Sequence, residues 1–363
     1  MGKIKAFITV LVVIMIVMGV GGVLSVHPIK SETFALTGTE GKFFLYHPIR
    51  IERVYQYDNA GRIVEYEAGR DYIIDYKRGT ICRTEDSRIP NYDEHTVIYN
   101  DNGSFSFSAQ PRNPELNIEY QVLVDYITLL KPWRSVASKD GLKNTVNKLK
   151  RGENIKIILC GDSIAAGAQT TGLYYFNNHM QTTFLGELDA FLEEFYDVNV
   201  DSVLFGENGA SLEYMNENVN QIIELKPDVV LIEFGMNDHA VEKPLAVQDL
   251  FAFQLESVVE KCYEQGIEVV LIGFFQQNSE WEMEDESATR VYNDLIAETA
   301  DKYGIPFVDI YRAFMALERK DIYEDLTSDY MHHPTDFGHM IYFSELVPYF
   351  LDKDTREIQN YLY

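Results

Sequence analysis

The second half of this chain alternates short apolar runs with amphipathic stretches, and this alternation limits the possible folds more than any other feature. The runs are rich in β-branched residues and have the length of strands buried on both faces. The stretches between them carry apolar residues at helical spacing, as Phe184, Leu188 and Leu192 do. Strands that alternate with helices form parallel sheets with right-handed crossovers. We therefore predict a three-layer α/β/α domain with five parallel strands, at residues 155–160, 200–205, 228–234, 268–274 and 306–310.

The first of these runs ends in a turn that carries a hydroxyl group. Gly161, Asp162 and Ser163 directly follow the run, at the end of a strand where open α/β sheets place their reactive groups. Alone, such a tripeptide is ordinary turn chemistry. Three later blocks accompany it: GENGAS at 206–211, GMND at 235–238 and DYMHHP at 329–334. Together these blocks, spanning about residues 153–350, resemble the four motif blocks of the SGNH (GDSL-type) hydrolase superfamily, which implies a flavodoxin-like strand order of 2-1-3-4-5.

The resemblance implies a role for each block. A serine hydroxyl becomes a good nucleophile when a positioned base takes its proton and a third group orients the base. By resemblance, Ser163 is the nucleophile, and its backbone N–H is one donor to the oxyanion of the tetrahedral intermediate. Gly209 supplies a second N–H and Asn237 supplies a side-chain amide, each donor worth about 3 kcal/mol.

Two adjacent histidines compete for the role of the base. The superfamily pattern is Asp-x-x-His-Pro, whereas here the histidine before proline stands four residues after Asp329, at His333. His332 has the usual spacing instead. A subgroup reading Asn-His-Pro-Asn-Asp-Phe-Gly-His, in which the histidine before proline is the base, resembles this chain more closely. We therefore favour His333 as the base and assign Asp329 to orient it, with a backbone carbonyl as the alternative orienting group.

Residues 1–30 are predicted to be a targeting segment. Lys3 and Lys5 precede an uncharged apolar stretch at 6–26, which is about as long as a membrane-spanning helix. The end of this stretch offers a poor cleavage site, so an uncleaved anchor is favoured over a signal peptide. Either interpretation places the protein outside the cytoplasm, anchored to the membrane or secreted.

The rest of the chain divides into three parts. Residues 31–135 contain short alternating or aromatic-rich runs separated by turn signals, which predicts a small all-β sandwich domain whose function stays open. Residues 136–152 form a linker with a helix. Residues 153–363 form the hydrolase domain.

Composition limits the partners. The net charge of −26 argues against nucleic acid and against an anionic membrane surface, so the N-terminal segment is the one membrane contact we expect. The three cysteines are widely spaced and suggest neither a disulfide framework nor a zinc site. We expect no metal and no cofactor, and the oligomeric state stays open.

The substrate expectation comes from two lead-in segments. Residues 149–157, before the first block, and 226–230, before the third, resemble those of bacterial carbohydrate esterases. They imply a serine esterase that removes short acyl groups, acetyl above all, from a polysaccharide or another glycan. The alternatives are a lipase, lysophospholipase or O-acyltransferase using the same site, and an inactive surface protein that binds glycans.

Overall fold

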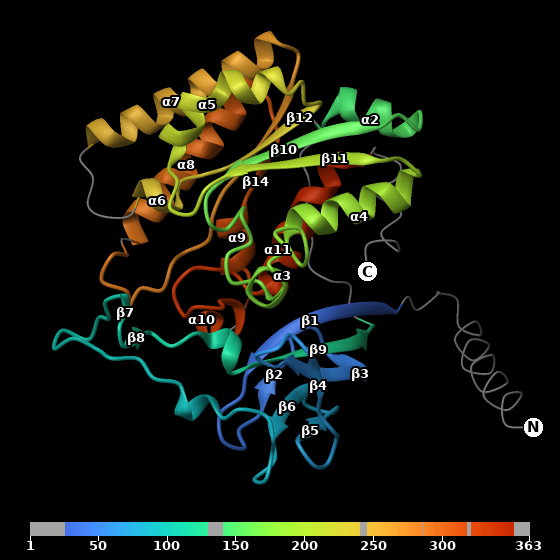
Figure 1. Cartoon of the computed structure of the whole chain (residues 1–363), viewed down its shortest axis with the longest axis vertical. Coiled ribbons are helices and arrows are strands. Elements are labelled where there is room, and N and C mark those ends of the chain that lie inside the picture. The colour runs from blue at the N-terminus through green and yellow to red at the C-terminus, as the bar shows by residue number, and fades with distance from the viewer. Residues whose placement is uncertain (1–25, 130–140, 240–244, 285, 318–320, 352–363) are drawn as a thin grey trace, which may run out of the picture.

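A computed structural model of the protein describes residues 26–129, 141–239, 245–284, 286–317 and 321–351. An all-β region and an α/β region lie against each other (Figure 1). The apolar stretch predicted to be an anchor or a signal lies outside the described residues, except for Val26. Among the residues that are described, no helix is both long enough and apolar enough to cross a membrane.

The predicted five-stranded parallel sheet is confirmed. Its strand order is β11-β10-β12-β13-β14, which is the order 2-1-3-4-5 along the chain. The three central strands are buried almost throughout and form the core of the α/β region. The last strand is shorter than predicted because the Asp309 side chain accepts a hydrogen bond from the Arg312 N–H and starts helix α9. The strands are β10 (Ile155–Gly161), β11 (Val200–Gly206), β12 (Val229–Glu233), β13 (Glu268–Ile272) and β14 (Phe307–Val308).

Helices cover both faces of this sheet, as a three-layer arrangement requires. Helices α5, α7 and α8 lie on one face, and α4 and α11 lie on the other (Figure 1). The helices of the region are α2 (Lys143–Lys150), α3 (Thr171–Phe176), α4 (Phe184–Tyr196), α5 (Leu212–Glu224), α6 (Met236–His239), α7 (Leu245–Glu264), α8 (Glu286–Tyr303), α9 (Ile310–Met315), α10 (Ile322–Leu326) and α11 (Asp336–Leu346), followed by the 3₁₀ turn η3 (Val347–Phe350).

The N-terminal region is all-β, as predicted. It contains a four-stranded antiparallel sheet in the order β1-β9-β3-β4 and a three-stranded sheet in the order β2-β6-β5. Phe44 contacts Phe34 and Tyr126 edge to face, with ring centroids 5.0 and 4.9 Å apart. The elements are β1 (His27–Ala35), β2 (Lys42–Phe43), β3 (Pro48–Tyr57), β4 (Ile63–Glu65), β5 (Tyr72–Asp75), β6 (Thr80–Arg83), η1 (Tyr92–Glu94), β7 (Ser108–Ala109), β8 (Arg112–Asn113), η2 (Asn117–Glu119) and β9 (Gln121–Thr128).

The first strand begins earlier than the sequence suggested. Strand β1 starts at His27, so residues 27–30 belong to the sheet and not to the targeting segment assigned to 1–30. Pairing explains the difference, because His27, Pro28 and Ile29 each lie opposite a residue of β9. Strand β1 also packs against α10 and α11, which brings the all-β region next to the C-terminal helices (Figure 1).

Candidate active site

Ser163 lies in the turn that follows β10, at the carboxyl edge of the parallel sheet. The turn is held by Asp162, whose Oδ1 accepts a hydrogen bond from the Ile164 N–H at 2.8 Å. The close approach of strands β10 and β11 restricts which residues can stand next to this turn. A Cβ atom on Gly206 would lie 2.6 Å from the carbonyl oxygen of Gly161, so the ends of β10 and β11 can meet only with glycine there. The Ser163 side chain therefore leaves the sheet at its edge.

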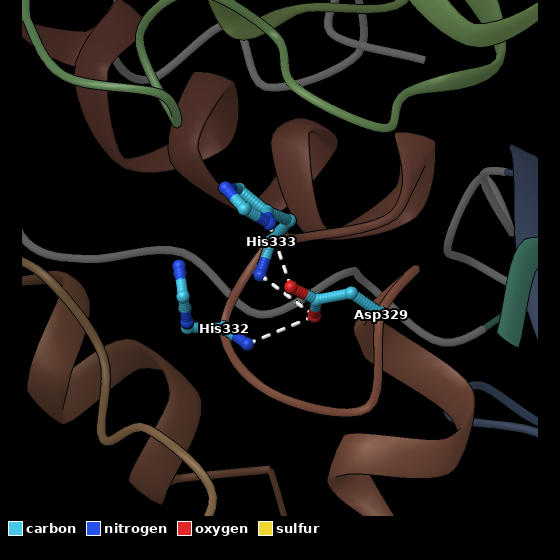
Figure 2. Close-up of side chains that lie close together, drawn as sticks. All are labelled: Asp329, His332 and His333. Carbon is cyan, nitrogen blue, oxygen red and sulfur yellow. Dashed lines mark hydrogen bonds and ion pairs between the residues drawn. The ribbon is translucent and has the colours of Figure 1, made fainter. Parts of the chain in front are cut away.

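Asp329 and His333 lie on the loop between α10 and α11. Oδ1 of Asp329 accepts hydrogen bonds from the backbone N–H groups of Met331, His332 and His333 at 2.9, 2.9 and 3.1 Å. Oδ2 contacts Nδ1 of His333 at 2.6 Å (Figure 2). The loop thus winds around the carboxylate, and residue 333 returns to it. This turn brings His333 to the carboxylate, although it stands four residues after Asp329 and not three.

Nε2 of His333 lies 2.9 Å from the Ser163 hydroxyl oxygen. The structure thus brings together the three side chains that the sequence placed in one group, although 170 positions separate Ser163 from His333. All three residues are largely buried. The arrangement is a continuous series of hydrogen bonds from carboxylate to imidazole to hydroxyl, which is the geometry of an activated serine.

His332 has different surroundings. Its ring stacks on Trp281 with centroids 5.2 Å apart and planes 26° apart. It also lies beside the ring of His333, at 4.3 Å between centroids. Sequence reasoning missed Trp281, because nothing in the local pattern around it indicates contact with a loop fifty residues later.

The three expected oxyanion donors differ in whether they already have a hydrogen-bond acceptor. Within the part of the chain that the structure describes, no hydrogen-bond acceptor pairs with the backbone N–H of Ser163 or of Gly209. Gly209 has a φ of +77°, a left-handed conformation that favours glycine. Asn237 differs from the expectation of an available amide: its Nδ2 donates to Oδ2 of Asp162 at 3.1 Å and to the carbonyl oxygen of Ala210 at 3.0 Å. An oxyanion would have to replace one of these two acceptors.

A cavity of about 470 Å³ opens beside the hydroxyl group of Ser163. Its apolar side chains come from Ala168, Leu173 and Tyr174. The rest of its wall consists of residues that are polar or belong to the four motif blocks. These residues are Ser163, Gln169, Asn208, Gly209, Asn237, His332 and His333.

The GDSL-like lipase/acylhydrolase family is represented by a model that matches residues 159–341 of the chain. The chain belongs to this family. It is accordingly a carboxylic ester hydrolase of the SGNH type.

Solved structures of several hydrolases resemble this family member. The acetylxylan esterase Axe2 from Geobacillus stearothermophilus is 21% identical, with a TM-score of 0.47, over 56% of this chain and 97% of that one. A lipase/acylhydrolase from Enterococcus faecalis is 20% identical, with a TM-score of 0.45, over 56% and 95%. LAE5, an α/β hydrolase from the metagenome of Lake Arreo, is 22% identical, with a TM-score of 0.44, over 54% and 94%. No curated protein sequence matches the chain.

Electrostatics couple the two loop residues of the hydrolase. Burial lowers the pKa of His333, but the adjacent Asp329 carboxylate raises it by more, so the net pKa lies above the usual value of about 6.5. Burial acts in the opposite direction on Asp329, and there the attraction to His333 prevails and holds the pKa of the carboxyl well below its usual range. Asp329 is therefore an anion at neutral pH and can keep a proton on Nδ1 of His333.

Two further buried acids, Asp162 and Glu233, lie in the same part of the hydrolase as Ser163. Burial raises the pKa of Asp162 to about 7. Burial, together with the nearby Asp162, raises the pKa of Glu233 well above its usual value. Glu233 was not among the predicted site residues. Its position at the end of the apolar run 229–232 was a signal, since a charged side chain in a buried strand is costly unless it is paired or neutral.

The hydrolase also has a group of possible metal ligands in this loop. Asp329, His332 and His333 can each offer one ligand atom, and these atoms lie within 4.8 Å of one another. However, Oδ1 of Asp329 already accepts three backbone N–H groups and Oδ2 already binds the His333 imidazole. A metal ion on this carboxylate would have to displace the contact that orients His333. The donor set therefore fits the hydrogen-bonded series to Ser163 better than it fits a metal ion.

Proposed function

We propose that this hydrolase is a serine esterase that removes short acyl groups, acetyl above all, from a glycan outside the cytoplasm. The single observation that carries the proposal is the series of contacts from Asp329 to His333 to Ser163, at 2.6 and 2.9 Å, beside an open cavity. Each contact has the length of a hydrogen bond between positioned catalytic groups.

The proposed reaction begins at the Ser163 hydroxyl. With the proton of the imidazole on Nδ1, the Nε2 lone pair of His333 takes the hydroxyl proton while Oγ attacks the acyl carbonyl carbon. The tetrahedral intermediate then collapses, and His333 returns the proton to the departing sugar oxygen. Water repeats the sequence on the acyl-enzyme and releases the carboxylic acid. Asp329 stabilises the imidazolium at both stages without taking its proton.

Negative charge on the former carbonyl oxygen needs donors that are already in place. The backbone N–H groups of Ser163 and Gly209 are suited to this role, because both residues line the cavity and neither N–H pairs with an acceptor among the described residues. Asn237 becomes the third donor when the oxyanion replaces the carbonyl oxygen of Ala210.

The cavity favours a small acyl group and a polar alcohol. Its apolar wall is limited to Ala168, Leu173 and Tyr174, which suits a methyl group better than a fatty acyl chain. Gln169 and Asn208 also line the cavity, and their amide groups can form hydrogen bonds with the hydroxyl groups of a sugar. A sugar that carries an acetate matches both features.

The proposed location outside the cytoplasm rests on the N-terminal sequence alone. The apolar stretch at 6–26 follows two lysines, as in a segment that inserts with its N-terminus inside. The esterase region would then face the outer side of the membrane, where acylated polysaccharides occur.

The full-length protein, purified in detergent, tests the proposal directly. We expect it to hydrolyse p-nitrophenyl acetate faster than longer esters and to release acetate from at least one of acetylated xylan, mannan, chitin oligomers and peptidoglycan. Ser163→Ala should abolish both reactions. Rates that rise with acyl length would indicate a lipase, transfer to an added alcohol in preference to water would indicate an acyltransferase, and an inactive protein that still binds glycans would refute the esterase proposal.

A further inference from the structure

The loop that carries Asp329 and His333 begins at a helix end that the all-β region completes. Helix α10 is short, and the carbonyl oxygens in the last turn of a helix have no partner within it. Two side-chain amides of the all-β region reach these oxygens. Nδ2 of Asn117 donates to the carbonyl oxygens of Tyr323 and Thr327 at 2.7 and 2.9 Å. Nε2 of Gln121 donates to those of Glu324 and Thr327 at 2.6 and 2.8 Å.

These amides are buried and held in place from behind. Asn117 is 0% exposed and Gln121 is 2% exposed. The Oδ1 atom of Asn117 accepts a hydrogen bond from the Tyr92 hydroxyl at 2.8 Å, which fixes the direction of its amino group. Each amide therefore presents both of its N–H groups to the loop, in an environment where an unpaired carbonyl oxygen is costly.

Further contacts from the all-β region hold both ends of the same loop. The backbone N–H of Ile118 donates to the carbonyl oxygen of Ser328 at 3.2 Å. The Thr33 hydroxyl on β1 bonds to the carbonyl oxygen of Asp325 and lies 3.0 Å from the hydroxyl of Thr335. The held segment leads directly to the catalytic pair, because the Ser328 N–H donates to the His333 carbonyl oxygen at 2.8 Å.

We propose that Asn117 and Gln121 are positioning residues for ester hydrolysis, and that the all-β region is part of the catalytic apparatus and not a separate binding module. This inference rests on the proposed function, because it assigns the pair Asp329 and His333 to catalysis. Neither amide lines the cavity, so they act on the position of the base and leave substrate contacts unchanged.

The effect of removing the two amides follows from the geometry. Replacing Asn117 and Gln121 by leucine leaves the carbonyl oxygens of Glu324 and Thr327 without these donors and that of Tyr323 with the Thr327 hydroxyl in place of two donors, so the loop must shift to find others. A displacement of about 1 Å at a catalytic group costs about 100-fold in rate. We therefore expect Asn117→Leu/Gln121→Leu to lower kcat by about 100-fold while KM changes by less than about threefold.

A pH profile separates positioning from simple loss of folded protein. The Asp329 contact raises the pKa of His333 above its usual value. A looser contact lowers that pKa, so the acid limb of kcat/KM should move to lower pH in the double variant. Titration with a serine-reactive organophosphonate counts the competent sites, so that kcat is expressed per folded enzyme.

Asp71→Leu is the matched control. Asp71 is a buried side chain of the same all-β region, and it accepts hydrogen bonds from the backbone N–H groups of Glu67 and Arg88 and from the Arg88 guanidinium. It has no hydrogen bond to the segment 321–335. This variant destabilises the region without touching the loop, and we expect kcat per titrated site and the acid limb to stay at the wild-type values.

Thr33→Val keeps the inference testable if the double variant does not fold. Valine preserves the shape and strand propensity of Thr33 and removes only its two hydrogen bonds to the loop. We expect about a tenfold loss of kcat and a smaller shift of the acid limb in the same direction.

Parallel assays of Ser163→Ala and His333→Ala separate the two proposals. If both variants stay active, the proposed function is wrong. If both are inactive while Asn117→Leu/Gln121→Leu, or Thr33→Val in its place, keeps kcat per site within about twofold and an unmoved acid limb, the esterase mechanism stands and the positioning role is refuted.

Discussion

Exchanging the two adjacent histidines for other residues gives the most direct test of the site. His333→Ala removes the imidazole whose Nε2 lies 2.9 Å from the Ser163 hydroxyl oxygen. Loss of the base in a catalytic triad costs about three orders of magnitude or more in kcat. A thousandfold loss corresponds to about 4 kcal/mol in the activation barrier.

We expect a much smaller effect from replacing the other histidine. His332→Asn removes the stacking contact with Trp281, whose ring centroid is 5.2 Å away. Such an aromatic pair contributes about 0.5–1.5 kcal/mol. If this contact accounts for the cost of the substitution, the rate falls by no more than about tenfold. The two variants should therefore differ by at least about a hundredfold.

The assay is the steady-state hydrolysis of p-nitrophenyl acetate, with kcat expressed per site titrated by an organophosphonate. His332→Asn retaining most of its activity beside an inactive His333→Ala supports the reasoning. The reverse order would make His332 the base and restore the usual Asp-x-x-His spacing. Equal, large losses in both variants would show that the stacked ring, too, is needed for proton transfer.

Four other outcomes are expected. Activity should persist in EDTA, because both oxygens of Asp329 are engaged in hydrogen bonds; a complete loss restored by zinc or calcium would contradict this. Asp329→Asn should lower kcat by about 10⁴-fold and move the acid limb of kcat/KM to lower pH, since the carboxylate raises the pKa of His333 and the base works only when neutral; an unmoved limb would speak against the coupling. Asn237→Ala should lower kcat by about 10²- to 10³-fold, and a change confined to KM would remove Asn237 from the oxyanion site. Full-length protein should fractionate with membranes and keep its first residues, whereas mature protein in the medium starting near residue 27 would indicate a cleaved signal.

Much of the α/β sheet could be predicted because its signals are local. A buried parallel strand is a continuous apolar run, and all five predicted strands begin and end within two residues of the observed strands. The fifth is short because the Asp309 side chain caps the next helix, and this cap competes with strand pairing at the same residues. A hydrophobic pattern does not show which of the two interactions prevails.

The site residues that lie within the motif blocks could be predicted from the sequence. The residues that reach the site only through contacts made in the folded protein could not. Ser163, Asp329 and His333 meet at hydrogen-bond distances, although their roles await the tests above. No local pattern singles out Asn117 or Gln121, since Asn117 and its partner Tyr323 are 206 positions apart. An amide that donates to distant backbone carbonyls looks like any other polar residue until the fold is known.

The contact between β1 and the end of α10 has a consequence for the order of assembly. Thr33 and its partner Asp325 are 292 positions apart, so strand β1 leaves the ribosome long before the segment that it will bind. Contacts that join such distant parts of a chain form late in folding. The turn that carries Ser163 is synthesised 170 residues before His333, its proposed base. A nascent chain that has passed Ser163 therefore lacks the proposed base until the loop at 329–333 has also been made.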